Sequence, residues 1–181
     1  MSLLISSVSM TTGVSIRSST GTVLGSATVT ALPGFIEPVT IPTTGTYTVV
    51  VDPSLSHTGS VTLNLYDVDP DVTGTLTINA AAINVSLPTE GQNAAFTFAG
   101  TSGQQITVRI TNADIRAPSG SSTSVTVKLL KPDGTVLTTM TGFGATFNLS
   151  TQTLPTTGTY TVVVDPKMAD TGSLSLRVSN P

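Results

Sequence analysis

Pro155-Thr-Thr-Gly-Thr-Tyr-Thr-Val-Val-Val-Asp-Pro166 is the stretch that decides the fold, because the same twelve residues occur earlier in the chain as Pro42–Pro53. Around these copies, residues 14–65 align without gaps on residues 127–178 at a constant offset of 113, the separation of Gly45 and Gly158. Self-similarity at a fixed spacing is typical of repeated structural units. The sequence therefore predicts two tandem units, each organised around one copy of the stretch.

Both copies have the pattern of a β-strand. Tyr160, Val162 and Val164 fall on one face of an extended chain, whereas Thr159 and Thr161 fall on the other. Similar alternation recurs along the chain between turn signals, and no segment has a clear helical period. We expect an all-β fold, an antiparallel jelly-roll or Greek-key β-sandwich in which the repeated stretch is a central strand.

The turn before each of these strands has the spacing Pro-x-x-Gly-x-Tyr. This spacing is like the tyrosine corner of Greek-key sandwiches, where a Tyr at the start of a strand hydrogen-bonds back to the preceding loop. We expect Tyr47 and Tyr160 to act in this way, with Gly45 and Gly158 as structural positions in the same turns.

The two units differ in what precedes their shared part. Residues 72–104 contain candidate strands at Thr75–Asn79, Ile83–Leu87 and Ala94–Ala99, and nothing before residue 2 corresponds to them. We therefore expect an incomplete sandwich repeat at 1–71 and a complete one at 72–181. Removing three strands uncovers apolar side chains worth roughly 10–20 kcal/mol at about 1.5–3 kcal/mol each. The first unit is expected either to be sealed against the second or to accept strands from another chain.

Two connecting segments follow from the alignment. Upstream of the shared part, Leu4 is best placed opposite Val108, an offset of 104, so the second unit has nine additional residues between Asn112 and Ser124. We expect them as a loop insertion. The segment Asp67–Asp71 contains a proline and is expected to be a short, stiff connector between the units.

Composition restricts the classes of partner. Only 9% of the residues are charged, against about 25% in a typical soluble domain, which is unusual for a cytoplasmic protein. The net charge of −3 and the lack of a basic cluster argue against nucleic acid or an anionic membrane as partner. The sequence has no cysteine, no recognisable signal peptide and no stretch long enough to cross a membrane. We expect an extracellular or cell-surface location and a chain that is a piece of something longer.

Asp67, Asp69 and Asp71 alternate like the start of a calcium-binding loop, in which a hard cation takes several carboxylate oxygens. Val72 stands where such a loop needs its Gly, and Ile78 stands where it needs a bidentate Glu. The two interpretations are a Ca²⁺ site at these three aspartates and a solvated acidic connector. Otherwise no cofactor is expected.

Binding and catalysis have few candidate residues. Carbohydrate sites usually present aromatic platforms, and Tyr66 and Phe143 are the aromatic residues at plausibly exposed positions. His57 is the one histidine, and it aligns with Asp170 in a Thr-Gly turn, which is typical of a polar residue in a surface loop. We expect no enzyme activity.

Four segments together resemble a known family. They are Phe96-Thr-Phe-Ala-Gly-Thr-Ser-Gly-Gln-Gln-Ile-Thr-Val108, Val127-Lys-Leu-Leu-Lys-Pro-Asp-Gly-Thr-Val-Leu137, Leu154–Val162 and Gly172–Leu176. In this order they are similar to the bacterial pre-peptidase C-terminal (PPC-like) sandwich domain, and more so to its tandem form in large secreted or surface proteins. The resemblance implies a jelly-roll-like, non-catalytic accessory or spacer module outside the cell. It also implies that polysaccharide, fibrous protein or calcium are possible ligands.

Two hypotheses therefore stand. The first is a structural or spacer repeat module of a bacterial extracellular or surface protein, which forms a homo-oligomer or contacts neighbouring repeats of a longer chain. Self-assembly would then proceed by strand donation. The second is an accessory adhesion module that targets polysaccharide or a fibrous protein.

Overall fold

A computed structural model describes residues 1–30 and 32–181. These residues form β-strands, turns and loops and contain no helix, which confirms the predicted all-β class. It follows that no helix among them is long and apolar enough to span a membrane. The chain divides into two compact units, unit 1 at Met1–Val68 and unit 2 at Asp69–Pro181, which are described separately below.

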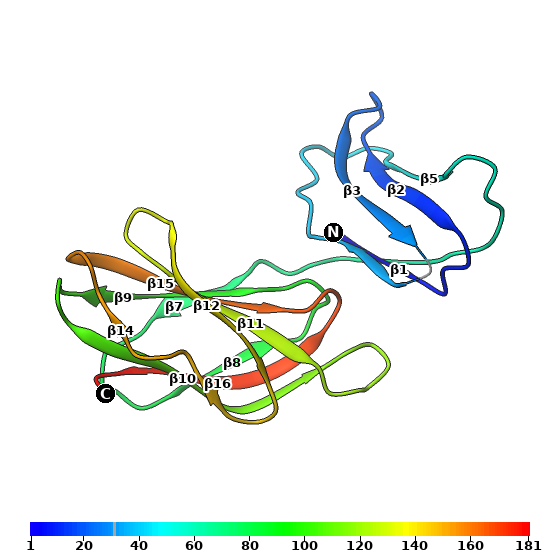
Figure 1. Cartoon of the computed structure of the whole chain (residues 1–181). Helices are drawn as coiled ribbons and strands as arrows, with labels where there is room; N and C mark the ends of the chain where they lie inside the picture. The colour runs from blue at the N-terminus through cyan, green and yellow to red at the C-terminus, as the bar shows by residue number, and fades with distance from the viewer. Residues whose placement is uncertain (31) are drawn as a thin grey trace. The chain divides into compact units, whose positions relative to one another are not determined.

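Unit 2 is a two-sheet sandwich (Figure 1). One sheet has the order β12-β11-β15-β9-β7, and the other has the order β13-β10-β16-β8, with β14 also paired to β10. The strands are β7 (Val72–Thr75), β8 (Ile83–Leu87), β9 (Ala94–Gly100), β10 (Gln105–Arg116), β11 (Ser124–Leu130), β12 (Val136–Phe143), β13 (Phe147–Asn148), β14 (Gln152–Thr153), β15 (Gly158–Pro166) and β16 (Thr171–Ser179).

The core of unit 2 lies between its two sheets. Every second residue of β15 and β9 points inward, so that Tyr160, Val162 and Val164 join Phe96 and Phe98 in one buried apolar cluster. β10 and β16 contribute alternate residues to the same cluster from the opposite sheet. The alternation in the sequence thus predicts the buried face of each of these strands.

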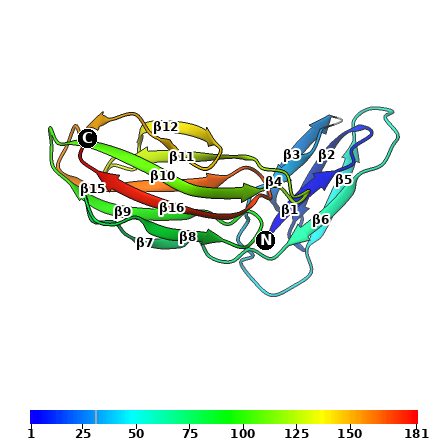
Figure 2. The ribbon, with the colours of Figure 1, turned by 90° about the horizontal axis from the view of Figure 1, so that it is seen from below.

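Unit 1 has two three-stranded sheets with the orders β4-β1-β6 and β3-β2-β5; all six strands are labelled in Figure 2. Its strands are β1 (Ser2–Ser6), β2 (Thr11–Arg17), β3 (Val23–Thr30), β4 (Gly34–Ile36), β5 (Thr48–Pro53) and β6 (Thr62–Tyr66). The offset of 113 places β2, β3, β5 and β6 on β11, β12, β15 and β16, and β1 aligns with β10. Unit 1 therefore repeats the topology of unit 2 without counterparts of β7, β8 and β9.

The structure corrects the expected strand at Thr75–Asn79. β7 covers Val72–Thr75 instead, and it pairs parallel to β9, so one sheet of the otherwise antiparallel sandwich is mixed. The chain turns after Leu76, where Ala80 N–H donates to the Thr77 carbonyl and Asn79 has a φ of 67°. Period-two alternation continues through this segment in the sequence, but the positive φ ends the extended backbone.

The expected loop insertion between Asn112 and Ser124 is only partly a loop. β10 continues to Arg116 and pairs with β16 on both sides of a register shift between Thr111 and Asp114. Asn112 has a φ of 52° at this shift, as expected for a β-bulge. The additional residues thus extend β10 and lengthen its connection to β11, which lies in the other sheet.

Candidate functional site

The distinctive feature of unit 1 is a pair of open strand edges, on β5 and β6. Among the described residues β5 forms strand pairs only with β2, and β6 only with β1. Their equivalents in unit 2 are paired on both sides, β15 with β11 and β9, and β16 with β10 and β8. Figure 2 shows β6 beside β1 at the margin of unit 1. The prediction of a central strand therefore holds for Pro155–Pro166 and is wrong for Pro42–Pro53, because the counterpart of β9, which would flank β5 on its second side, is missing.

Apolar side chains along these edges are exposed. Leu63 and Leu65 on β6 are 37% and 53% exposed, whereas their counterparts Leu176 and Val178 are 0% and 1% exposed. Tyr47, just before β5, and Val49 and Val51 on β5 are only half-buried, whereas the corresponding residues of β15 are fully buried. The same residue pattern thus forms a closed core in unit 2 and an open slot in unit 1.

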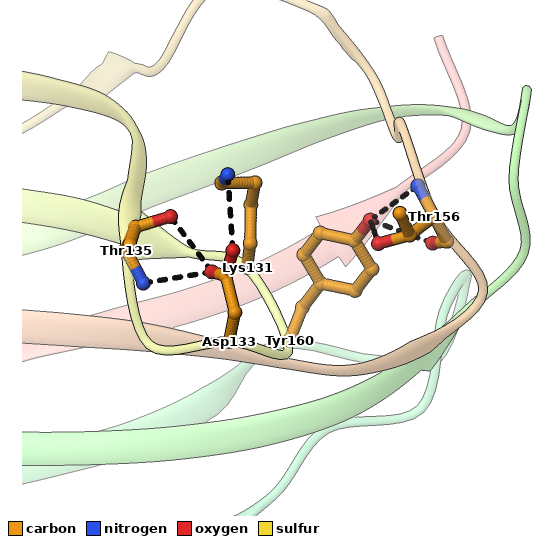
Figure 3. Close-up of polar contacts among 5 residues, drawn as sticks. All are labelled: Lys131, Asp133, Thr135, Thr156 and Tyr160. Atoms are coloured by element: carbon orange, nitrogen blue, oxygen red, sulfur yellow. Dashed lines mark hydrogen bonds and ion pairs between the residues drawn. The ribbon is translucent and has the colours of Figure 1, made fainter.

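Both tyrosines make the hydrogen bond of a tyrosine corner. The Tyr160 hydroxyl donates to the Thr156 carbonyl at 2.7 Å (Figure 3), and the Tyr47 hydroxyl donates to the Thr43 carbonyl at 2.8 Å. Thr156 N–H also donates to the Tyr160 hydroxyl at 3.3 Å. Each bond ties the loop before its strand to the tyrosine ring, but β15 begins at Gly158, whereas β5 begins only at Thr48, three residues after the equivalent Gly45.

The two structural glycines differ in their surroundings. Gly158 starts β15 opposite Gly100, and a Cβ at Gly158 would lie 2.7 Å from a side-chain carbon of Pro132. A Cβ at Gly45 would meet nothing within 4 Å. Close packing therefore requires glycine at Gly158, whereas the space around Gly45 is open.

β9 occupies the edge of β15 in a defined register. Gly158 pairs with Gly100, Tyr160 with Phe98, and Val164 with Ala94. The rings of Phe98 and Tyr160 stack with centroids 5.6 Å apart. Backbone pairing fixes the register, and the aromatic pair fills the space between the sheets.

The turn after β9 is also bound to the repeated stretch. Ser102 N–H donates to the Thr157 hydroxyl at 3.0 Å, and the Ser102 hydroxyl donates to the Pro155 carbonyl at 3.1 Å. Gly103 N–H donates to the Leu154 carbonyl at 2.8 Å. The acceptors that bind β9 and its turn therefore lie within the stretch that unit 1 repeats, apart from Leu154, which is Ile41 in unit 1.

The predicted calcium ligands are not brought together into a metal site. No group of three or more His, Cys, Asp or Glu residues within 1–30 and 32–181 is placed to hold a metal ion. Asp67 belongs to unit 1, and Asp69 and Asp71 belong to unit 2; all three are exposed. Asn93 N–H donates to an Asp71 carboxylate oxygen at 3.2 Å, and Gln92 donates to the Pro70 carbonyl at 2.8 Å. These bonds attach the end of the connector to unit 2.

The two aromatic candidates lie in different units. Phe143 ends β12 and is 68% exposed, so its ring is available to a ligand. Tyr66 ends β6 and is half-buried. His57 is exposed in a loop of unit 1, as expected of a surface polar residue.

Two carboxyl groups of unit 2 have shifted pKa values. Hydrogen bonds from the side chain and backbone of Thr135, with a smaller effect of Lys131, lower the pKa of Asp133 to about 2 (Figure 3). Burial raises the pKa of Asp170, and this outweighs the lowering effects of Thr123 and Lys167. One Asp170 carboxylate oxygen is buried without a hydrogen-bond partner in the described structure.

Sequence reasoning missed Leu63 and Leu65 as site residues. Their alternation with polar residues places them on a buried face, and only the missing counterpart of residues 72–104 indicates that this face is open. Sequence reasoning also missed the burial of Asp170. The repeat aligns Asp170 with His57 in a polar turn, which indicates a surface position, but His57 is exposed and Asp170 is buried.

No protein-family model matches the chain, and no curated protein matches it. Among solved structures, it is similar to the pre-peptidase C-terminal domain of collagenase from Bacillus anthracis, at 18% identity and a TM-score of 0.40 over 64% of this chain and 99% of that one. It is also similar to PliG, a periplasmic inhibitor of g-type lysozyme from Aeromonas hydrophila, at 17% identity and a TM-score of 0.41 over 61% and 99%. A third similar structure is that of the infectious bursal disease virus Gt strain, with 13% identity and a TM-score of 0.29 over 98% of this chain and 54% of that one. With TM-scores below 0.5, these likenesses carry no argument about what the chain does.

Proposed function

We propose that this chain is a non-catalytic structural repeat module of a bacterial extracellular or cell-surface protein, in which unit 2 is a self-sufficient spacer and unit 1 joins the module to other polypeptide. The observation that carries the proposal is the pair of open edges on β5 and β6. An exposed strand edge presents unpaired N–H and C=O groups, which are a template for pairing with another strand.

The exposed apolar residues support a role in assembly. Leu63 and Leu65 project from β6 where unit 2 has fully buried residues. Complete burial of such a side chain stabilises a protein by about 1.5–3 kcal/mol. A strand that covered the slot would therefore add stability that the described residues of unit 1 do not provide by themselves. The low content of charged residues supports an extracellular location, because the surface is built from Ser, Thr and Asn.

A second candidate function is supported by the exposed ring of Phe143. An aromatic residue with 68% of its surface exposed is suited to stacking on a sugar ring or packing on a fibrous protein. In this alternative the module would target an exoprotein to its substrate, with or without calcium.

A depletion assay with insoluble polymers distinguishes the structural function from the targeting function. The full chain is incubated with insoluble cellulose, chitin, peptidoglycan and collagen fibrils, with calcium or with a chelator, and the unbound fraction is measured. The structural function predicts no saturable depletion under any condition. Saturable depletion that Phe143→Ala abolishes, and that Val136→Ala on the same strand leaves intact, would overturn it in favour of the targeting module. Val136 is a suitable control because it is also exposed.

A further inference from the structure

We infer that the open side of unit 1 binds an extended segment from outside residues 1–181 that has the residue pattern of β9, in the register that β9 itself has on β15. This inference rests on the proposed structural function and specifies the partner. The pattern is Ala94-Ala-Phe-Thr-Phe-Ala-Gly100: small or aromatic residues at every second position, and a glycine where the strand meets the tyrosine corner.

Backbone pairing defines the register. In unit 2, seven consecutive residue pairs join β15 and β9 antiparallel, from Gly158 with Gly100 to Val164 with Ala94. Subtracting the offset of 113 places Gly45 opposite the glycine of the incoming segment and Val51 opposite its first alanine. The receiving residues Gly45–Val51 are identical to Gly158–Val164. Thr48–Val51 are already extended in β5, and binding in this register would extend Gly45–Tyr47 as Gly158–Tyr160 are extended in β15.

Side-chain packing specifies the aromatic positions. In unit 2 Phe98 stacks on Tyr160, and Phe96 pairs with Val162. In unit 1 the corresponding receptors are Tyr47 and Val49, which are half-buried. Phe96 and Phe98 also lie in the same buried cluster as Leu176 and Val178, the counterparts of the exposed Leu63 and Leu65. Aromatic residues at these two positions would therefore cover the apolar groups that unit 1 exposes.

The turn that follows the strand adds a polar anchor. Ser102 and Gly103 bind the Pro155 carbonyl, the Thr157 hydroxyl and the Leu154 carbonyl in unit 2. Unit 1 presents the same groups on Pro42, Thr44 and Ile41. Two of the three acceptors are backbone carbonyls, so the change from Leu to Ile leaves them unaltered. A Gly-Thr-Ser-Gly sequence after the strand is therefore part of the recognised pattern.

A second copy of this chain cannot supply the segment without loss. Each chain contains two acceptor strands, β5 and β15, but only one β9, and that strand is already paired with β15. A swap between copies would open one slot for every slot that it closes. The donor is therefore a segment outside residues 1–181 that carries the β9 pattern.

The probe is a labelled synthetic peptide of residues 93–104, titrated into the full chain and followed by fluorescence anisotropy. We expect saturable binding with one site per chain. Replacing both phenylalanines of the peptide by serine should abolish binding. In the chain, Tyr47→Ala should weaken binding about tenfold through loss of the ring contact and its buried area, and Phe143→Ala, which removes an exposed ring from unit 2, should leave it unchanged.

A fusion variant provides the second measurement. Residues 72–104 are joined directly before Met1, which keeps the offset of 104 between β1 and β10. We expect unit 1 to melt at a higher temperature, the amides of Gly45–Val51 to become protected from hydrogen exchange, and the peptide no longer to bind.

The outcomes distinguish the inference from the function on which it rests. Absence of peptide binding together with an unchanged melting temperature of the fusion variant overturns the inference. A concentration-dependent dimer that protects β5 and excludes the peptide also overturns it, by assigning the edge to a second copy, but leaves the structural function intact. Saturable depletion by a polysaccharide or by collagen that depends on Phe143 overturns the function itself, whatever the peptide does.

Discussion

Tyr47 and Tyr160 make the same hydrogen bond in surroundings that differ in solvent exposure. Both hydroxyls donate to a backbone carbonyl four residues earlier. Tyr160 is fully buried beneath β9, whereas Tyr47 is half-buried at an open edge. At the scale of the residue, the local sequence determines that the hydrogen bond forms. The neighbouring strand determines how much the bond contributes to the free energy of unfolding.

Replacing each tyrosine by phenylalanine measures this difference. Tyr160→Phe should lower the free energy of unfolding by about 1 kcal/mol, because a partly buried hydrogen bond from a fully buried tyrosine is lost. Tyr47→Phe should cost less than about 0.5 kcal/mol, because water replaces the hydroxyl at Thr43. Urea unfolding followed by circular dichroism checks both values. Equal costs would contradict the assigned difference in burial.

Asp170 makes the stability of unit 2 depend on pH. Burial raises its pKa in the folded state above the unfolded value near 3.8, so the folded state binds the proton more tightly. The penalty for the buried carboxylate is therefore absent below pH 3.8 and grows as the pH rises through the raised pKa. Asp170→Asn should make unit 2 more stable than the parent at pH 7, with a difference that shrinks toward pH 4. Thermal melts across this range test it; a constant difference would be inconsistent with titration of Asp170.

At the scale of the element, β6 and β16 have the same alternation but different neighbours. β16 lies between β10 and β8, whereas β6 pairs only with β1 among the described residues. A strand buries its inward face completely only when the sheets extend beyond it on both sides. The missing β8 and β9 therefore account for the exposure of Leu63 and Leu65.

Alanine substitutions at matched positions test this explanation. Leu176→Ala should cost about 2–5 kcal/mol, because it leaves a cavity in a closed core. Leu63→Ala should cost about 1 kcal/mol or less, because the side chain is already partly in water. Chemical unfolding of the two variants gives the comparison, and a large cost for Leu63→Ala would mean that the slot is already covered in solution.

At the scale of the whole molecule, the two units differ in the size of their cores. The apolar cluster of unit 2 includes buried residues from both of its sheets, contributed by β8, β9, β10, β11, β15 and β16 among others. The buried cluster of unit 1 consists of Leu3, Ile5, Val14, Ile16, Val29 and Ile36. A unit of this size buries a smaller fraction of its surface, so its stability is marginal.

Producing the two units as separate fragments tests whether unit 1 is less stable than unit 2. Residues 69–181 alone should unfold cooperatively at the temperature of the unit 2 transition in the full chain, whereas residues 1–68 alone should melt at a lower temperature. Differential scanning calorimetry measures both transitions. If the 1–68 fragment melted at or above the temperature of the 69–181 fragment, unit 1 would have to be complete without further strands.

Much of the fold could be predicted from the sequence. The repeat at an offset of 113 predicts that the two units share their topology, and alternation predicts the boundaries of Ile83–Leu87 and most of Ala94–Gly100. The segment after Val72 was placed wrongly, because its pairing partner β9 is distant in the sequence and parallel. The calcium ligands at Asp67, Asp69 and Asp71 stay a prediction, as does the ligand role of Tyr66 and Phe143.

The sequence by itself determined most of the longer strands, their inward faces, the tyrosine corners and the absence of a counterpart to residues 72–104. These features depend on the alternation of side chains along an extended backbone and on short-range turns, which are local properties. Only the tertiary structure decided that the Pro155–Pro166 copy is central and the Pro42–Pro53 copy lies at an edge. The physical reason is that the pairing of a strand edge depends on residues far away in the chain, so the inward faces of identical local sequences are buried in one unit and only half-buried in the other.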